Sequence, residues 1–158
     1  MNQAQDLTGI ARAILDSILY MVLGTSDESG RPWVSPVYFA SARYREFYWM
    51  SSPEALHSRN ILVRPQLSIV IFDSRIPVGM GQAVYMSAVA EELRGTQLDR
   101  GLQIYNGRFS EPAEYGVRII NPEHVQAPAP YRLYRATAHE HWVLDPEGHP
   151  DHRMPVHV

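Results

Sequence analysis

The sequence contains no cysteine in its 158 residues. A chain without thiols has no cysteine nucleophile, no disulfide and no thiolate ligand for a metal ion. This absence fits a reducing compartment. The chain also shows no signal peptide and no apolar run long enough to cross a bilayer. We therefore expect a cytoplasmic protein that does not bind a membrane.

Positive charge is limited as well, because 14 Lys and Arg stand against 17 Asp and Glu, for a formal net charge of −3. This balance gives no basic surface for nucleic acid, and no block of Lys or Arg indicates a membrane surface. The composition, 45% hydrophobic and 20% charged, is that of a globular domain with a real core. We expect one domain over residues 1–158, with its core at about 15–144 and a polar, loosely held tail at 145–158.

Apolar periodicity divides the chain into six expected strands and three expected helices. The expected strands are residues 20–25, 31–40, 46–51, 66–73, 82–94 and 131–144. The expected helices are residues 7–19, 53–63 and 97–105. Residues 108–130, rich in proline and glycine, are expected to be mostly loop with one short element. Hairpin connections favour antiparallel pairing, so the fold class is mainly β (α+β), a small closed sheet with helices outside.

Two of these strands carry more specific predictions. Apolar side chains occupy both parities in residues 66–73, which predicts a strand buried on both faces. Alternation in residues 131–144 places Trp142 on the same face as Tyr134 and places His139 and His141 together on the opposite face.

Polar groups concentrate where the strand ending near Ser51 turns into a helix. Ser52 suits the N-cap and Pro53 the first helical position, while Thr96 can cap the following helix in the same way. A run of hydrogen-bond donors follows the first cap: His57, Ser58, Arg59 and Asn60. Such donors at a helix start suit a phosphate. The alternative is an ordinary surface helix with its polar residues outside.

Seven histidines suggest a metal site as another alternative. His139 and His141 lie two residues apart on an expected strand, and the tail contains His149, His152 and His157. Two histidines at this spacing and an acid can bind zinc. The spacing fixes no third ligand, so we expect no metal.

Residues 25–39, 48–65 and 79–93, with a weaker match at 131–142, together resemble the flavin-binding split β-barrels related to pyridoxamine 5′-phosphate oxidase. In that family the first stretch is the opening hairpin and the second is the strand–turn–helix that binds the flavin phosphate. The resemblance covers roughly residues 15–142. It implies a six-stranded antiparallel split β-barrel with flanking helices.

The resemblance also implies which residues would contact a bound FMN. These are Ser35, Pro36, Val37, Tyr38, Ser51, Ser52, His57, Arg59, Asn60, Gln82 and Trp142. The strand around Ser35 would line the flavin ring, chiefly through backbone groups, and the two serines at 51 and 52 would contact the ribityl chain or the phosphate. Trp142, with a poor match at Arg153, resembles a Trp…Arg pair that reaches the flavin from the partner subunit.

Two positions depart from the family pattern. His57 lies where the family usually has a lysine on the phosphate, and Leu56 lies where it often has an arginine. A neutral histidine and a leucine supply less positive charge than that pair. The resemblance therefore implies either that Arg59 and Asn60 help to bind the phosphate or that FMN is bound more weakly.

The family implies an FMN-dependent oxidoreductase that acts on a small-molecule substrate, as a homodimer with the cofactor at the subunit interface. The flavin performs the electron chemistry, so no protein nucleophile is required. Two alternatives stay open: a non-catalytic protein that binds or senses flavin, deazaflavin or haem, and a metal-dependent or purely structural small β-barrel. Pyridoxamine phosphate oxidation itself is not expected, because His149-Pro150-Asp151 stands where that enzyme has an Arg-x-His pair.

Overall fold

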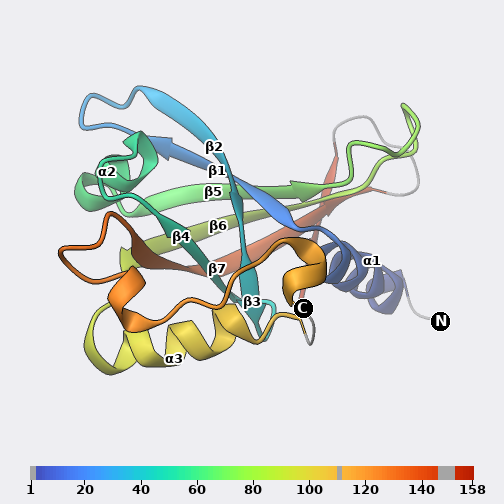
Figure 1. Ribbon diagram of the computed structural model, residues 1–158. Helices are drawn as coiled ribbons and strands as arrows, with labels where there is room; N and C mark the ends of the chain where they lie inside the picture. Colours follow the sequence, from blue (N-terminus) through green and yellow to red (C-terminus); the bar gives the residue numbers. More distant parts are fainter. Residues whose placement is uncertain (1–2, 110–111, 146–151) are drawn as a thin grey trace.

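The computed structural model describes residues 3–109, 112–145 and 152–158. The helices are α1 (Gln3–Ser17), α2 (Leu56–Val63) and α3 (Gly95–Asn106), and two short 3-10 helices are η1 (Pro112–Tyr115) and η2 (Pro122–His124). The strands are β1 (Tyr20–Ser26), β2 (Pro32–Tyr38), β3 (Ala40–Ala42), β4 (Glu46–Ser51), β5 (Gln66–Phe72), β6 (Ala83–Glu92), β7 (Arg132–Leu144) and β8 (Arg153–Val156). Figure 1 shows the strands as one curled sheet with the helices around it.

The sheet is antiparallel throughout, in the order β2-β1-β5-β6-β7-β4-β3, and β8 also pairs with β7. It curls into a half-barrel whose inner face holds the main core. Fully buried members of that core include Met21, Leu23, Phe47, Trp49, Ile69, Ile71 and Val84. The predicted fold class is therefore confirmed.

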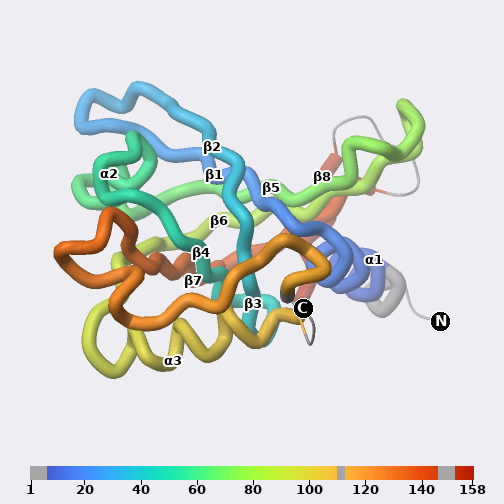
Figure 2. Tube along the Cα trace, in the orientation of Figure 1, coloured from blue at the N-terminus to red at the C-terminus, as the bar shows by residue number. Residues whose placement is uncertain are grey.

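The sheet has eight strands in the described part of the chain, not the predicted six. The expected strand at 31–40 divides at Phe39, because β2 pairs with β1 whereas β3 pairs with β4. The polar tail contributes β8 (Figure 2). Arg153 of this strand lies opposite Leu144 of β7. The expectation of a loosely held tail is thus wrong for residues 153–156. The described part of residues 108–130 likewise contains two short 3-10 helices, where one short element was expected.

A bulge in β7 overturns the predicted faces of that strand. Ser87 of β6 pairs with Glu140, but the next residue, Ala88, pairs with Ala138, so β7 carries one extra residue at His139. An extra residue reverses the alternation beyond it. His141 is therefore buried and His139 is exposed. Trp142 lies on the opposite face of the strand from the buried Tyr134.

The strand β5 is buried on one face only, which corrects the second face prediction. Leu67, Ile69 and Ile71 lie in the core, whereas Phe72 is 46% exposed and Val70 is half-buried. No described element covers the apolar residues of the outer face.

Both predicted N-caps are wrong in detail. Helix α2 begins at Leu56, and its N-cap Ala55 makes no side-chain hydrogen bond. The Ser52 hydroxyl instead accepts from the Glu54 N–H at 3.2 Å in a preceding turn. Helix α3 begins at Gly95, so Thr96 lies inside it. The predicted end of α2 before Pro65 is confirmed, because a residue before proline avoids helical geometry.

Helices α1 and α3 pack on different parts of the sheet. Leu7, Ala11 and Leu15 of α1 join the main core, whereas α3 lies over β3, β4 and β7 and forms a second core there. Among the described residues, no helix has both the length and the apolar character needed to span a membrane.

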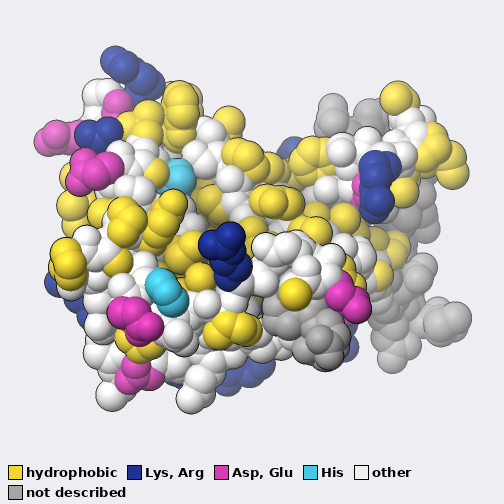
Figure 3. All heavy atoms as spheres, viewed as in Figure 1, with side chains coloured by type: hydrophobic (Ala, Val, Ile, Leu, Met, Phe, Trp, Pro, Cys, Tyr) yellow, Lys and Arg dark blue, Asp and Glu magenta, His cyan; other side chains and the backbone are white. Residues whose placement is uncertain are grey.

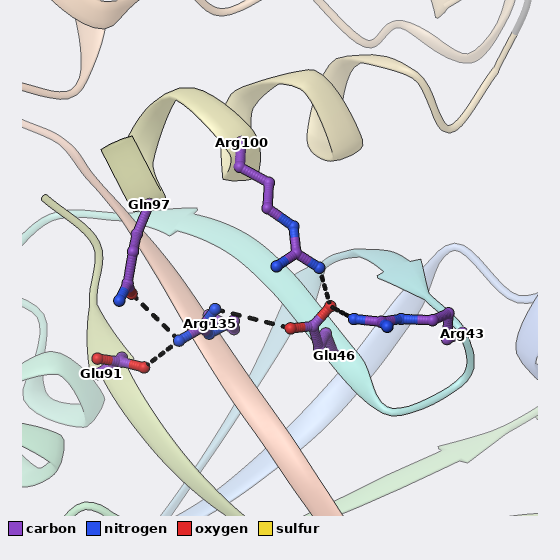
Figure 4. A network of polar contacts seen from close by, with 6 residues as sticks. All are labelled: Arg43, Glu46, Glu91, Gln97, Arg100 and Arg135. Atoms are coloured by element: carbon purple, nitrogen blue, oxygen red, sulfur yellow. Dashed lines mark hydrogen bonds and ion pairs between the residues drawn. The ribbon is translucent and has the colours of Figure 1, made fainter. Parts of the chain in front are cut away.

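An ion-pair network also ties α3 to the sheet (Figure 4). Glu46 of β4 contacts Arg100 of α3 at 2.8 Å, Arg43 at 3.2 Å and Arg135 of β7 at 3.6 Å. Arg135 also pairs with Glu91 of β6. The network therefore holds α3 against the sheet.

Candidate functional site

Strand β2 has an open edge, because it ends the sheet. The Phe39 N–H donates to the Leu19 carbonyl at 3.3 Å, and alternate residues of an antiparallel strand turn their amides to the same side. The odd-numbered residues therefore face β1. Val34, Pro36 and Tyr38 face the open edge, where a proline costs no ladder hydrogen bond. The backbone N–H groups of Val34 and Tyr38 are thus directed away from the sheet.

Strand β4 has an open edge over its last residues as well. Strand β3 pairs only with the segment from Glu46 to Tyr48, so Trp49, Met50 and Ser51 have no strand on that side. Strands β2 and β4 approach each other without pairing. The sheet is therefore split between them, and α2 stands at the wide end of the split (Figure 1).

The His57 side chain bridges the split. Its Nδ1 lies 3.1 Å from Ser35 Oγ on β2, and its Nε2 lies 2.9 Å from Ser51 Oγ on β4. His57 is only 9% exposed and Ser51 8%. Burial lowers the pKa of His57, so the imidazole is neutral at pH 7. The structure thus brings three predicted site residues into one hydrogen-bonded cluster.

Both ring nitrogens of His57 are occupied in this arrangement, so the imidazole has no group left for a direct phosphate contact. Trp33 supports the cluster, because its Nε1–H donates to Ser35 Oγ at 3.0 Å. Sequence reasoning missed this support. The spacing of Trp33 and Ser35, two residues apart on one strand, was a signal that could have found it.

Asn60 lies inside the barrel wall and is 2% exposed. Its Nδ2 donates to Thr25 Oγ1 at 3.0 Å, and the Thr25 hydroxyl donates to the Trp33 carbonyl at 3.2 Å. Asn60 therefore fixes α2 to β1 and β2. The role of Thr25 gave no signal in the sequence, because it depends on a partner 35 residues away.

The remaining residues near α2 lie closer to solvent. Ser52 is half-buried in the turn before the helix. Arg59 is exposed, and its backbone N–H donates to the Ala55 carbonyl at 3.0 Å, whereas its side chain has no hydrogen bond or ion pair to a described residue. Leu56 is 40% exposed. Arg59 is consequently the one cation of α2 itself that is free to reach a ligand.

The outer face of the sheet carries an apolar groove of about 680 Å³. Its lining includes Val22, Val34, Val70, Tyr85, Trp142 and Arg153. The Arg153 guanidinium carbon lies 4.4 Å from the centroid of the Tyr85 ring. Strand β8 thus brings Arg153 to the same groove as Trp142, although the sequence match at Arg153 was poor. The volume is within the usual range for small-molecule sites.

Gln82 lies at the end of the β5–β6 hairpin, with its Oε1 buried and without a hydrogen-bond partner in the described chain. Strand β5 separates this hairpin from α2, which places them about 20 Å apart at ~3.3 Å per residue. Trp142 lies near the end of β7, whereas Ser51 pairs with Arg132 at its beginning. One chain therefore does not bring Gln82 or Trp142 to the His57 cluster.

A smaller cavity of about 300 Å³ adjoins the other end of β2. Tyr20, Tyr38, Met50, Tyr105 and Arg118 contribute to its lining. Burial raises the pKa of Tyr38 and of Tyr105, so both phenols are neutral. Arg118 was not identified from the sequence, because it comes from an irregular loop. The surrounding face is rich in hydrophobic side chains (Figure 3).

The metal alternative gains no support from the described residues. No group of three His, Asp or Glu side chains there is placed to hold a metal ion. His139 and His141 lie on different faces because of the bulge, and His141 Nε2 contacts the Tyr44 carbonyl at 2.8 Å. His149, like the Pro150-Asp151 pair, falls outside the described residues.

The half-barrel, its split between β2 and β4, and the helix at the wide end define a split β-barrel. Residues 7–145 match the model of the family described as pyridoxamine 5′-phosphate oxidase. The match spans most of the chain, which therefore belongs to this family. The predicted family is confirmed.

Solved structures show the same fold at low identity. A heme binding protein from Mycobacterium smegmatis is 20% identical with a TM-score of 0.68, and 92% of this chain aligns with 55% of that protein. The heme storage protein HutZ from Vibrio cholerae is 21% identical with a TM-score of 0.67, over 84% of this chain and 90% of that one. A protein named F420 reductase is 17% identical with a TM-score of 0.58, over 82% and 94% respectively. This chain therefore spans little more than half the length of the mycobacterial protein. No curated protein matches it.

Proposed function

We propose that this protein binds FMN between two copies of the chain and acts as an FMN-dependent oxidoreductase on a small molecule. The observation that carries the proposal is the His57 cluster at the split, where Ser35, Ser51 and His57 gather beside the open edge of β2. Hydroxyl donors suit the phosphate end of FMN, and the backbone groups on the open edge suit the heteroatoms of the ring. When bound, FMN would supply the electron-transfer chemistry.

The residues present fit FMN with one reservation about charge. Ser35, Ser51 and Ser52 offer hydroxyl groups near the phosphate end, and Arg59 is an exposed cation on the same helix as His57. No lysine or arginine takes the place of His57. In the free protein the groups at the phosphate end are therefore mainly neutral hydrogen-bonding groups, unlike the cation-rich site that the family usually has.

A second copy of the chain would complete the site. Trp142, Arg153 and Gln82 lie far from the His57 cluster in one chain, and no described segment covers the apolar outer groove. Exposed apolar patches of this kind mark association surfaces. A two-fold dimer would allow the groove of one protomer to face the split of the other, so that both groups of residues reach one cofactor.

A second candidate is a carrier or sensor of haem or a deazaflavin. The breadth and apolar lining of the groove favour a large planar ring, whether or not the ligand carries a phosphate. Related folds are named as haem-binding and as F420 reductase. The hydroxyl-rich cluster at the split favours FMN, because haem has no phosphate for it to hold.

The test is to titrate the purified protein separately with FMN, deazaflavin F420 and haemin and to record visible spectra. We expect saturable FMN binding, followed by turnover with a reduced nicotinamide and an electron acceptor. Gln82→Ala should weaken FMN binding, with Gln103→Ala, an exposed glutamine of α3, as the matched control. Saturable binding of haemin alone would refute the FMN proposal in favour of the second candidate.

A further inference from the structure

The His57 cluster has a fixed number of hydrogen atoms to share. A neutral imidazole carries one N–H group and one acceptor nitrogen. It therefore donates to the Oγ of one serine and accepts the hydroxyl hydrogen of the other. Only the serine that receives the N–H keeps its own hydroxyl hydrogen for a ligand. With His57 neutral, the pair of Ser35 and Ser51 thus offers one donor.

A protonated imidazole changes this number. Both ring nitrogens then carry hydrogen and donate to both serines, at the observed separations of 3.1 Å to Ser35 and 2.9 Å to Ser51. Both hydroxyl hydrogens are released. Trp33 does not compete for them, because an indole nitrogen only donates. One added proton therefore yields a second donor and a positive charge, both of which strengthen phosphate binding.

We propose that this protein grips the phosphate of its cofactor by taking up one proton at His57, which creates on binding the cation that a lysine would carry permanently. The inference rests on the proposed FMN function. His57 is a positioning residue in it, because its nitrogens hold Ser35 and Ser51 and the serine hydroxyls contact the phosphate.

The charges around His57 are consistent with such a response. Strands β1 and β2 contain no charged residue, and the acidic residues of β4 and β6, Glu46, Glu91 and Glu92, are paired with arginines. On its own segment, Glu54 and Arg59 are exposed. Burial alone lowers the pKa of His57 in the free protein. A phosphate dianion beside the cluster would raise it.

The sign of the effect follows from linkage. Because the bound pKa of His57 exceeds the free one, FMN binding takes up a proton at pH values between them. The contribution of His57 to affinity is present at low pH and is lost as the pH rises through the bound pKa. Riboflavin, which lacks the phosphate, should show neither effect.

The experiment is calorimetric titration of the full chain with FMN and with riboflavin, in buffers of different ionisation enthalpy, at pH ~6 and ~8.5. His57→Gln keeps a neutral donor and acceptor but takes up no proton, and comparison with it cancels the protonation of FMN itself. On FMN binding, we expect the wild type to bind as much as about one proton more than H57Q does. We also expect the ratio of H57Q to wild-type Kd to be roughly tenfold larger at the lower pH. Far-UV circular dichroism of H57Q, and of His57→Asn as a second variant, shows whether a loss of FMN affinity reflects misfolding.

A second variant tests the positioning role. If His57 acts through the serines, H57Q has no further effect on FMN affinity in a Ser35→Ala/Ser51→Ala background. If the imidazolium contacts the phosphate itself, H57Q still weakens binding in that background, and the positioning role is overturned.

The outcomes separate this inference from the proposed function. If FMN binds and the wild type takes up no more protons than H57Q, the inference is wrong and the proposed function stands. If FMN does not bind, the proposed function fails, and the His57 resonances are then followed by NMR during titration with inorganic phosphate. A phosphate-induced rise in the His57 pKa supports proton-linked phosphate binding, and an unchanged pKa overturns it.

Discussion

The two regions that bear on function lie on opposite faces of one sheet and are built in opposite ways. The cluster at the split lies on the inner face, since Ser35 shares the parity of Val37 and Ser51 shares that of Trp49, both of which are buried. Its side chains hydrogen-bond to one another within one chain. The groove on the outer face is apolar and broad, and the described part of the chain leaves it open.

This difference shows which part of the site a single chain can complete. The cluster at the split needs only α2, β2 and β4 to be in place, so its geometry is set by folding. The groove exposes valine and aromatic side chains to water at a free-energy cost that a second surface would remove. The following predictions test that contrast, from the largest expected effect to the smallest.

Val70→Asp should convert a dimer of this protein into a monomer. Val70 lines the outer groove, and a carboxylate buried there without a partner would cost several kcal/mol of association free energy, on the order of the penalty for an unpaired buried charge. Size-exclusion chromatography with light scattering measures the change. Ile119→Asp, at an exposed loop position, is the control. A V70D protein that remains dimeric would place the interface elsewhere.

Leu23→Ala and Val22→Ala compare the two faces at adjacent positions of β1. Leu23 is fully buried in the inner core, so its truncation should lower the free energy of unfolding by about 2–5 kcal/mol. Val22 borders the outer groove, and its truncation should cost less than about 1 kcal/mol in the monomeric V70D background. Urea denaturation measures both. Equal losses would show that the outer face is as well packed as the core.

Asn60→Ala should destabilise the attachment of α2 to the sheet. The buried amide donates to Thr25, and its removal leaves a buried hydroxyl without that donor, at a cost of about 1–3 kcal/mol. Arg59→Ala, the exposed neighbour, should change stability by less than about 0.5 kcal/mol. Thermal denaturation of the two variants decides the point. If R59A is the more damaging, the inner cluster is held by something other than this amide.

Acidification should reduce the free energy of unfolding modestly. Burial lowers the folded-state pKa of His57 and of His141 below the ordinary value of 6.5. The unfolded chain therefore binds more protons, and stability present above that value is lost as the pH falls through it. Urea denaturation at pH ~7.5 and ~5.5 measures the loss. The H57Q variant should lose less stability between these two pH values. If its pH dependence equals that of the wild type, groups other than His57 cause the loss.

Much of the fold and part of the site could be predicted from local patterns. The hairpin at residues 27–30, the strand at β4 and the end of α2 before Pro65 follow from turn residues, alternation and proline sterics, which act over a few residues. The grouping of Ser35, Ser51 and His57 came from the family resemblance. Their exact partners did not, because two of the contacts span 22 and 6 residues and depend on how the sheet curls.

The sequence by itself determined a mainly β chain whose inner-facing positions are apolar, because alternation and turn chemistry are local properties. Only the tertiary structure decided that β7 bulges at His139, that the tail adds β8 beside Leu144, and that the predicted site residues divide between two faces. Each of those outcomes depends on strand register and curvature, which are set by contacts between segments far apart in the chain.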